Sequence, residues 1–160
     1  MKIPFLNLYL YKYPRCVLTA DIVLFNRKEE VLLIRRANNH FKGKLALPGG
    51  HVEENESTLE AVQRECVEET GLIVSSPRFV ALYETPGRDP RGDYKSALFW
   101  AEHSDTSIMP YFHLNKNEVQ EMKWLPWHHA VEMNLAADHA CMIVDAYYDR
   151  EKTLFYGDWK

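Results

Sequence analysis

The chain has 160 residues, a formal net charge of −4 and 46% apolar residues, which predicts one globular domain over residues 1–160. The acidic balance argues against a binder of nucleic-acid polymers, because such proteins usually carry net positive charge. Neither an apolar run of ~20 residues nor a signal-peptide pattern is present, so we expect a cytoplasmic protein with no membrane partner.

The predicted elements mix strands and helices without the regular strand–helix alternation of a Rossmann sheet. Runs of β-branched and apolar residues predict strands at 16–25, 31–36, 78–84, 94–102 and 119–125. Helical spacing of apolar residues predicts helices at 57–70 and 138–150. A short polar turn separates the first two strands, which predicts that they form a hairpin.

Each predicted helix carries an apolar stripe that would pack against the sheet. In the first helix the stripe is Leu59, Val62 and Cys66. In the second it is Cys141, Val144 and Tyr148. Ser57 or Thr58 can cap the start of the first helix, and Glu60 would complete a capping box with Ser57. Gly71 is placed to end this helix, and Cys16 is expected to be buried.

The first helix also has an unusual acidic face. Glu65, Glu68 and Glu69 fall within an arc of about 100° at helical geometry, where like charges repel one another. Such a cluster is either a solvated helix face or a site that needs a counter-charge. A hard divalent cation would suit the second interpretation, because Mg²⁺ and Mn²⁺ prefer oxygen ligands.

The spacing around these carboxylates favours the second interpretation. Five residues separate Gly50 from Glu56, and seven more lead to the segment 64–72, RECVEETGL. This pattern resembles the Nudix box in full, with Cys66 where an aliphatic residue is more usual. The segments FKGKLALPGG and ALPGGHVE resemble the loop and strand that precede the box in the ADP-ribose pyrophosphatase branch. The resemblance covers about residues 14–134.

The resemblance to the Nudix hydrolase superfamily implies a fold, a cofactor and a reaction. The fold would be α/β, an α/β/α sandwich around a central mixed sheet with the box as a loop–helix–loop. The reaction would be hydrolysis of a small-molecule nucleotide, a nucleoside diphosphate linked to another moiety, with Mg²⁺ or Mn²⁺ as cofactor. The implied metal ligands are Gly50, Glu65, Glu68 and Glu69. Arg64 would orient a glutamate, and the candidates for the general base are Glu68, Glu118 and Glu121.

The loop 85–93, TPGRDPRGD, is the second informative segment. Arg88 and Arg91 can grip phosphate in bidentate fashion, and Asp89 can accept a hydrogen bond from a ribose hydroxyl or hold an arginine. Gly, Pro and Asp are also common in plain exposed turns. The stretch resembles a pattern in the ADP-ribose pyrophosphatase branch and in regulators that sense ADP-ribose. Arg36, at the end of the second strand, is a further substrate-binding candidate.

Three functions are compatible with these features. The leading hypothesis is hydrolysis of ADP-ribose to AMP and ribose 5-phosphate. The second is a MutT-like diphosphatase acting on nucleoside triphosphates, which needs the box but not the two-arginine loop. The third is a non-catalytic module that senses ADP-ribose, although a degenerate box would be expected in a pure sensor. Enzymes that resemble this branch are often homodimers, and the sequence itself does not indicate an oligomeric state.

The remaining histidines and the charge distribution complete the expectations. His128, His129 and His139 lack the partners of a zinc site and are expected at the surface or at helix caps. Residues 51–70 hold seven Glu and one Arg, a net charge of −6, whereas the rest of the chain has 18 basic and 16 acidic residues. The acidity is therefore concentrated where the metal is expected, and arginines elsewhere can face phosphates.

Overall fold

The computed structural model describes residues 2–3, 8–9, 15–38, 40–108 and 112–156. A seven-stranded sheet forms its centre, and its strands are β3 (Val17–Phe25), β4 (Glu30–Arg36), β5 (Leu45–Ala46), β6 (Gly49–His51), β8 (Arg78–Tyr83), β9 (Tyr94–Glu102) and β11 (Val119–Pro126). Five of them run in the order β11-β4-β3-β9-β8, while β5 pairs with β4 and β6 with β3. The sheet is mixed, because β3 and β9 are parallel and the other pairs are antiparallel.

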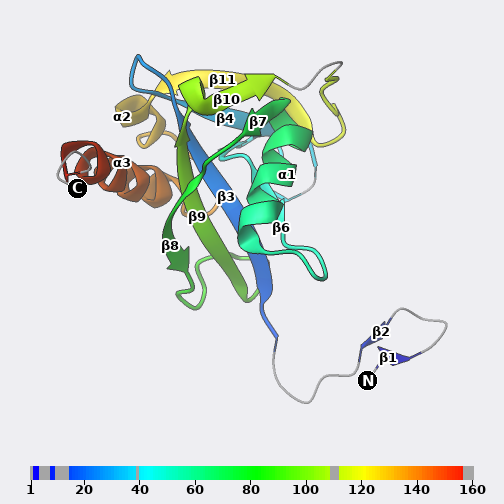
Figure 1. The fold of residues 1–160 in the computed structure, drawn as a ribbon. Coiled ribbons are helices and arrows are strands. Elements are labelled where there is room, and N and C mark those ends of the chain that lie inside the picture. Colours follow the sequence, from blue (N-terminus) through cyan, green and yellow to red (C-terminus); the bar gives the residue numbers. More distant parts are fainter. Residues whose placement is uncertain (1, 4–7, 10–14, 39, 109–111, 157–160) are drawn as a thin grey trace.

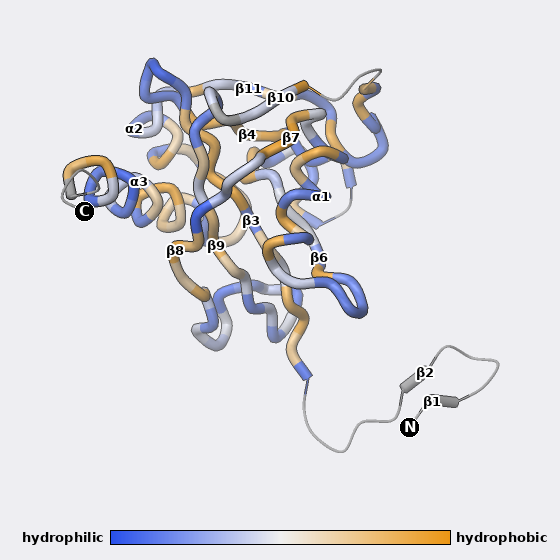
Figure 2. The backbone as a smooth tube through the Cα atoms, viewed as in Figure 1, coloured by the Kyte–Doolittle hydropathy of each residue, from blue (hydrophilic) through white to orange (hydrophobic). Residues whose placement is uncertain are grey.

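Helices cover both faces of this sheet, which makes the fold an α/β/α sandwich (Figure 1). α1 (Thr58–Thr70) lies on one face, and α3 (His139–Tyr156) lies on the other, after the short α2 (Trp127–Ala130). Side chains alternate along β3, so that Ala20, Ile22 and Leu24 pack toward α1, whereas Val23 and Phe25 pack toward α3. Hydrophobic residues therefore follow the central strands, and the loops are mostly hydrophilic (Figure 2).

Smaller elements complete the described chain. β7 (Leu72–Val74) follows α1 and pairs with β10 (Thr106–Ile108), which comes after the 3₁₀ turn His103–Asp105. β1 (Lys2–Ile3) and β2 (Leu8–Tyr9) pair with each other. None of the helices in the described ranges is long and apolar enough to cross a membrane.

The structure confirms the predicted fold class, strands and hairpin. It corrects the prediction of which residues of α3 are buried. The hairpin is β3–β4, in which Phe25 is paired with Val31. α3 buries Met142, Ile143 and Ala146 instead of the predicted stripe, and Cys141 is exposed. Apolar residues occur on several sides of this helix, so spacing alone does not identify the face that packs on the sheet.

Two further burial expectations are wrong. Cys16 is exposed because it lies just before β3 begins, outside the paired part of the strand. Leu59 is 43% exposed because it lies in the first turn of α1, whereas Val62 and Cys66 are buried as predicted. The buried face of the helix therefore begins after its first turn and continues to its last residue, Thr70.

Candidate active site

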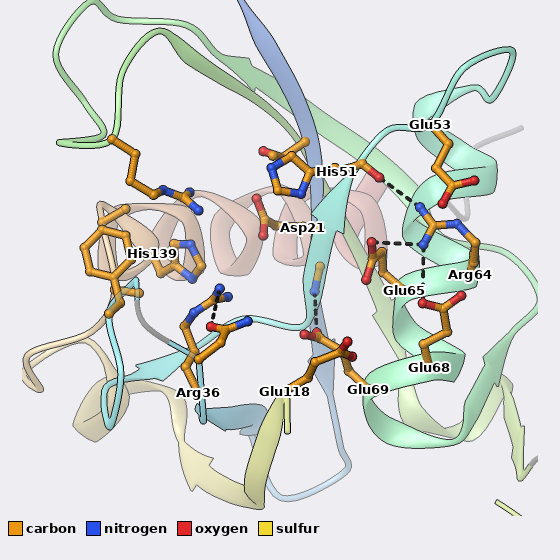
Figure 3. Close-up of a pocket in the computed structure, with 18 of the residues that line it drawn as sticks. Asp21, Arg36, His51, Glu53, Arg64, Glu65, Glu68, Glu69, Glu118 and His139 are labelled. Atoms are coloured by element: carbon orange, nitrogen blue, oxygen red, sulfur yellow. Dashed lines mark hydrogen bonds and ion pairs between the residues drawn. The ribbon is translucent and has the colours of Figure 1, made fainter. Parts of the chain in front are cut away.

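One polar cavity lies where the box helix, the edge of the sheet and the start of α3 meet (Figure 3). Its volume is about 340 Å³. It is lined by Thr19, Asp21, Arg36, Asn38, Phe41, Gly49, Gly50, His51, Glu53, Arg64, Glu65, Glu68, Glu69, Arg88, Arg91, Glu118, Ala136, Ala137 and His139. Residues from six separate parts of the sequence therefore share one cavity, and most of the predicted site residues are among them.

The ends of α1 are fixed as the sequence predicts. Ser57 is the N-cap, its hydroxyl accepts a hydrogen bond from the Glu60 N–H at 3.2 Å, and the Glu60 carboxylate accepts one from the Ser57 N–H at 2.9 Å. Gly71 ends the helix at φ 72°, a left-handed conformation that favours glycine. A Cβ on Gly71 would also overlap the ring of Phe112. These caps define the two ends of the helix that carries the acidic face.

Gly49 and Gly50 allow the edge strand β6 to lie directly against the acidic face. A Cβ on Gly50 would overlap the carboxylate of Glu65, and one on Gly49 would overlap Asp21. The Gly49 N–H donates a hydrogen bond of 2.9 Å to Oε2 of Glu69, which is buried. The two glycines therefore bring backbone atoms and carboxylate oxygens into the same small space.

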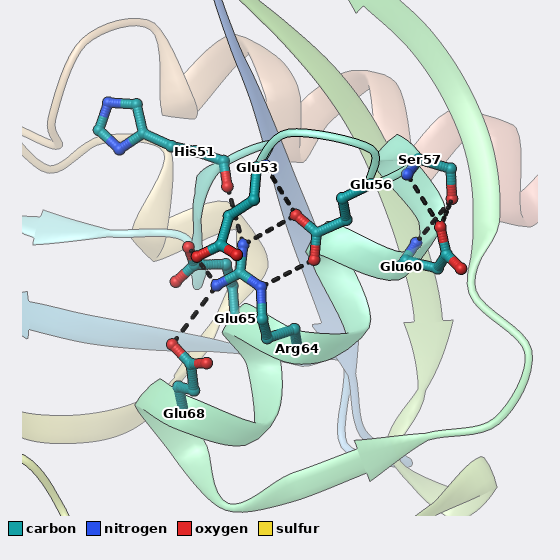
Figure 4. A network of polar contacts seen from close by, with 8 residues as sticks. All are labelled: His51, Glu53, Glu56, Ser57, Glu60, Arg64, Glu65 and Glu68. Carbon is teal, nitrogen blue, oxygen red and sulfur yellow. Dashed lines mark hydrogen bonds and ion pairs between the residues drawn. The ribbon is translucent and has the colours of Figure 1, made fainter. Parts of the chain in front are cut away.

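Arg64 is the centre of the polar network on α1 (Figure 4). Its Nε and Nη2 donate to the two oxygens of Glu56 at 2.8 and 3.0 Å, and Nη2 also donates to the carbonyl oxygen of His51 at 2.8 Å. Its Nη1 donates to Glu65 at 2.9 Å and more weakly to Glu68 at 3.4 Å. Hydrogen bonding to Arg64 holds the pKa of Glu56 below its ordinary value. A single guanidinium thus orients three carboxylates and one backbone loop.

Burial disfavours the charged form of two carboxylates on this face. Burial raises the pKa of Glu69 to about 8, and burial also raises the pKa of Glu65 although Arg64 is adjacent. We name Glu65, Glu68 and Glu69 the acidic wall. Buried carboxylate oxygens beside a backbone carbonyl are the donors that Mg²⁺ and Mn²⁺ prefer, so the chemistry of the acidic wall fits such a cation.

The acidic wall is not closed around a cation in this conformation. Within the described part of the chain, no group of three or more His, Cys, Asp or Glu side chains stands close enough together to form a complete metal site. Arg64 lies between Glu65 and Glu68, where its Nη1 contacts both. A cation bound here would therefore have to draw these carboxylates closer together.

Three arginines on the other side of the cavity form a basic wall, which we define as Arg36, Arg88 and Arg91. Arg88 donates through Nε and Nη2 to Asp138 at 2.9 and 2.5 Å, and Arg91 donates to Asp89 at 2.6–3.1 Å. The Arg91 guanidinium also lies 4.1 Å from the centre of the Tyr94 ring. These partners fix both guanidiniums, which leaves their remaining N–H groups to face the cavity.

Arg36 differs from the other two arginines. It donates to the carbonyl oxygen of His40 at 3.1 Å and to the side-chain oxygen of Asn38 at 3.2 Å. No carboxylate among the described residues forms an ion pair with it. Its positive charge is therefore available to an anion in the cavity.

Two predicted residues lie away from the cavity. Asp89 is buried under the loop 85–93, where it holds Arg91 and is out of reach of a ligand in the cavity. Glu121 is paired with Arg35 on the neighbouring strand, at 2.5 Å, and with Lys123 at 3.2 Å. Glu118 does line the cavity. It lies directly before β11, at the end where the pairing of β11 with β4 is irregular.

The structure adds residues that the sequence reasoning missed. Asp21 is 7% exposed in the middle of β3 and accepts a hydrogen bond from the Ser96 hydroxyl. An acidic residue inside an apolar strand was a usable signal, because buried charges need a reason. His139 was expected at the surface or at a helix cap, but it is 8% exposed and lines the cavity. His51 also lines the cavity, and no sequence signal marked it.

Comparisons with known proteins agree with this geometry. The NUDIX domain family matches residues 17–146. An ADP-ribose pyrophosphatase of Methanocaldococcus jannaschii is 44% identical over 136 residues, which cover 85% of this chain and 75% of that protein. The ADPR responsive transcriptional repressor NtrR of Acinetobacter baylyi is 28% identical over 84% of this chain and 54% of its own length.

Solved structures show the same fold. The NUDIX domain of Shewanella oneidensis NrtR, complexed with ADP ribose, aligns with a TM-score of 0.72 at 28% identity, over 86% of this chain and 90% of that one. A mutT/nudix family protein from Listeria innocua aligns with a TM-score of 0.70 at 31% identity, over 87% of this chain and 96% of that one. With the box intact on α1 and the family match spanning most of the chain, this protein belongs to the NUDIX family and is a Nudix hydrolase.

Proposed function

We propose that this Nudix hydrolase cleaves the pyrophosphate bond of ADP-ribose and releases AMP and ribose 5-phosphate. The observation that carries the proposal is that the acidic wall and the basic wall face one cavity. A pyrophosphate needs cationic groups around its oxygens, and a divalent cation bound to the acidic wall would add to the charge of the arginines. ADP-ribose is favoured because one relative is named as its pyrophosphatase and a similar NUDIX domain was solved with it.

The residues that would hold the cation are Glu65, Glu68, Glu69 and the carbonyl oxygen of Gly50. When bound, Mg²⁺ or Mn²⁺ would neutralise phosphate charge and lower the pKa of a bound water. Arg64 orients Glu65 and Glu56 and ties the α1 face to the carbonyl of His51. It therefore acts as a positioning residue for the acidic wall.

The general base in this proposal is Glu118. It lines the cavity and has no ion-pair partner among the described residues, so its carboxylate is available to accept a proton from water. Glu68 also lines the cavity, but it belongs to the set of oxygens that would hold the cation. Glu121 is engaged with Arg35 and Lys123.

The basic wall would bind the phosphates. Arg36 offers a charge with no carboxylate partner, while Arg88 and Arg91 are pre-oriented by Asp138 and Asp89. Pre-orientation matters because a planar guanidinium that is already fixed loses little entropy when it meets a phosphate. In this proposal Asp89 holds Arg91 in place instead of contacting the ribose.

The direct test is incubation of the purified protein with ADP-ribose and Mg²⁺, Mn²⁺ or EDTA, with the products separated by chromatography. We expect AMP and ribose 5-phosphate with either metal and no turnover in EDTA. A panel of nucleoside triphosphates is run in parallel. If ADP-ribose stays intact while pyrophosphate is released from a triphosphate, the substrate proposal fails and the MutT-like alternative replaces it.

A sensing role is the second candidate, because a repressor described as responsive to ADPR matches 84% of this chain. Calorimetry with ADP-ribose separates the two roles. Tight binding without hydrolysis in the presence of metal would favour sensing. Hydrolysis at a measurable rate would favour the enzyme, as the intact box does.

The base is tested by Glu118→Gln, with Glu121→Gln as the matched control. Both changes remove one carboxylate at nearly constant volume, and only Glu118 lines the cavity. We expect Glu118→Gln to lower kcat by a factor on the order of 10²–10⁴, the usual contribution of general-base catalysis. A larger loss in Glu121→Gln than in Glu118→Gln would contradict the assignment.

A further inference from the structure

His139 is the first residue of α3, and its ring is fixed against the core. Its Nδ1 accepts a hydrogen bond of 2.9 Å from the buried backbone N–H of Leu47. A ring nitrogen that accepts from an N–H carries no proton, so the proton of a neutral His139 sits on Nε2. The Leu47–Pro48–Gly49 segment that leads into the box thus determines the tautomer.

The other ring nitrogen has access to the cavity. His139 lines the cavity, and no hydrogen bond joins its Nε2 to another described residue. Nε2 is therefore the ring nitrogen that can meet a ligand in the cavity. Figure 3 shows the ring beside Arg36, on the side of the cavity away from Arg64 and Glu65.

The surroundings keep this ring uncharged. Burial lowers the pKa of His139, and the nearby charges of Arg88 and Arg36 lower it further, while Asp21 and Asp138 act in the opposite sense. The ring is therefore neutral at pH 7 and cannot serve as one more cation of the basic wall. It supplies a single N–H donor with a fixed direction.

We infer that His139 is a substrate-binding residue, whose Nε2–H donates a hydrogen bond to an oxygen atom in the phosphate–ribose part of the bound nucleotide. The inference rests on the proposed function, since it assigns a partner within the same cavity. The arginines attract any anion, whereas a fixed neutral donor requires an acceptor atom at one position. A ligand without that oxygen leaves the Nε2–H unpaired, which is the basis of discrimination between similar substrates.

The structure offers a matched pair of variants. In His139→Asn the side-chain oxygen can take the place of Nδ1 and accept from Leu47, but the donor no longer reaches the cavity. In His139→Gln the amide nitrogen can take the place of Nε2 and keep the donor. We expect His139→Asn to raise the Kd for ADP-ribose, measured by calorimetry in EDTA, and its KM with Mg²⁺ by about ten-fold, the loss of one hydrogen bond to ligand. His139→Gln should recover most of this affinity, and kcat should change by less than about two-fold in both.

Two controls separate this inference from a structural role and from the proposed function. His129→Asn removes an exposed imidazole and should leave Kd unchanged. Nitrogen NMR of the wild type should show His139 protonated on Nε2 and not on Nδ1. An equal loss of affinity in the Asn and Gln variants, an unchanged Kd in His139→Asn, or the opposite tautomer would overturn the inference. If the wild type neither binds nor cleaves ADP-ribose, the proposed function fails, and the same variants are then measured with the nucleotide that the substrate panel identifies.

Discussion

The acidic wall and the basic wall face the same cavity but are built in opposite ways. The acidic wall comes from five consecutive positions of one helix, 65–69, and Arg64 forms ion pairs with two of its carboxylates, Glu65 and Glu68. The basic wall comes from β4 and the loop 85–93, and two of its three arginines have a carboxylate partner of their own. Two carboxylates of the acidic wall share a single arginine, whereas Arg88 and Arg91 each have their own carboxylate partner.

This difference indicates what each wall does when a ligand arrives. Burial raises the pKa values of Glu65 and Glu69, and a divalent cation would stabilise their charged forms. The guanidiniums of Arg88 and Arg91 are held by Asp138 and Asp89, so their free edges are preorganised. A cation would draw the carboxylates of the acidic wall together, whereas their carboxylate partners already hold the guanidiniums of Arg88 and Arg91.

The largest expected effect comes from breaking the acidic wall itself. Glu65→Gln removes the carboxylate that lies against Gly50, and we expect kcat with Mg²⁺ to fall by a factor on the order of 10³, because metal-assisted charge stabilisation contributes several kcal/mol. Glu60→Gln is the control on the same helix, since glutamine keeps the capping box. If steady-state kinetics show Glu65→Gln within ten-fold of the wild type, Glu65 does not hold the metal.

The next largest loss of activity is expected from changing Arg64, whose guanidinium contacts two carboxylates of the acidic wall. Arg64→Lys keeps the positive charge but loses the fork that bonds to Glu56, Glu65 and the His51 carbonyl together. We expect kcat/KM to fall by about 10- to 100-fold, as for partners that orient metal ligands. Raising the Mg²⁺ concentration should restore part of the rate. A variant with wild-type kinetics and wild-type metal dependence would refute the positioning role.

The basic wall gives a smaller effect with a closely matched control. Arg36 lines the cavity, whereas its neighbour Arg35 is paired with Glu121. Arg36→Gln should raise KM by about ten-fold, since a hydrogen bond to a charged group contributes about 1.5–3 kcal/mol. Arg35→Gln should leave KM within about two-fold. Equal KM values in the two variants would show that the phosphate does not reach Arg36.

The contrast between the walls also explains what the sequence could predict. The acidic wall, its caps and its glycines are encoded by spacing within 24 residues, from Gly49 to Leu72, so local rules were sufficient. The strands followed from apolar runs that the sheet buries, whereas the sandwich was implied by the resemblance to the Nudix superfamily. The short strands β7 and β10 were missed, because three residues are too few for a periodic pattern. A strand in the region of β5 and β6 was indicated only by the resemblance of ALPGGHVE to the strand and loop before the box.

The geometry of the basic wall and of His139 depends on contacts between residues far apart in the sequence, which no local pattern contains. His139 bonds to Leu47, which is 92 positions away, and Arg88 bonds to Asp138, which is 50 positions away. Whether Glu118 or Glu121 reaches the cavity depends on the register between β11 and β4. Residue types at these positions were visible in the sequence, but their partners are set by tertiary packing.

The smallest effect tests whether the α1 caps serve stability alone. Ser57→Ala removes the hydroxyl that accepts from the Glu60 N–H, and we expect a loss of about 1 kcal/mol in the free energy of unfolding, or a Tm lower by about 2–4 °C. Thermal unfolding measures the shift, and kinetics on the same sample should give an unchanged kcat. The cap lies more than one helical turn before Glu65, so the hydrogen bonds of Arg64 can hold the acidic wall without it. A kcat that falls together with Tm would mean instead that the position of the acidic wall depends on the start of the helix.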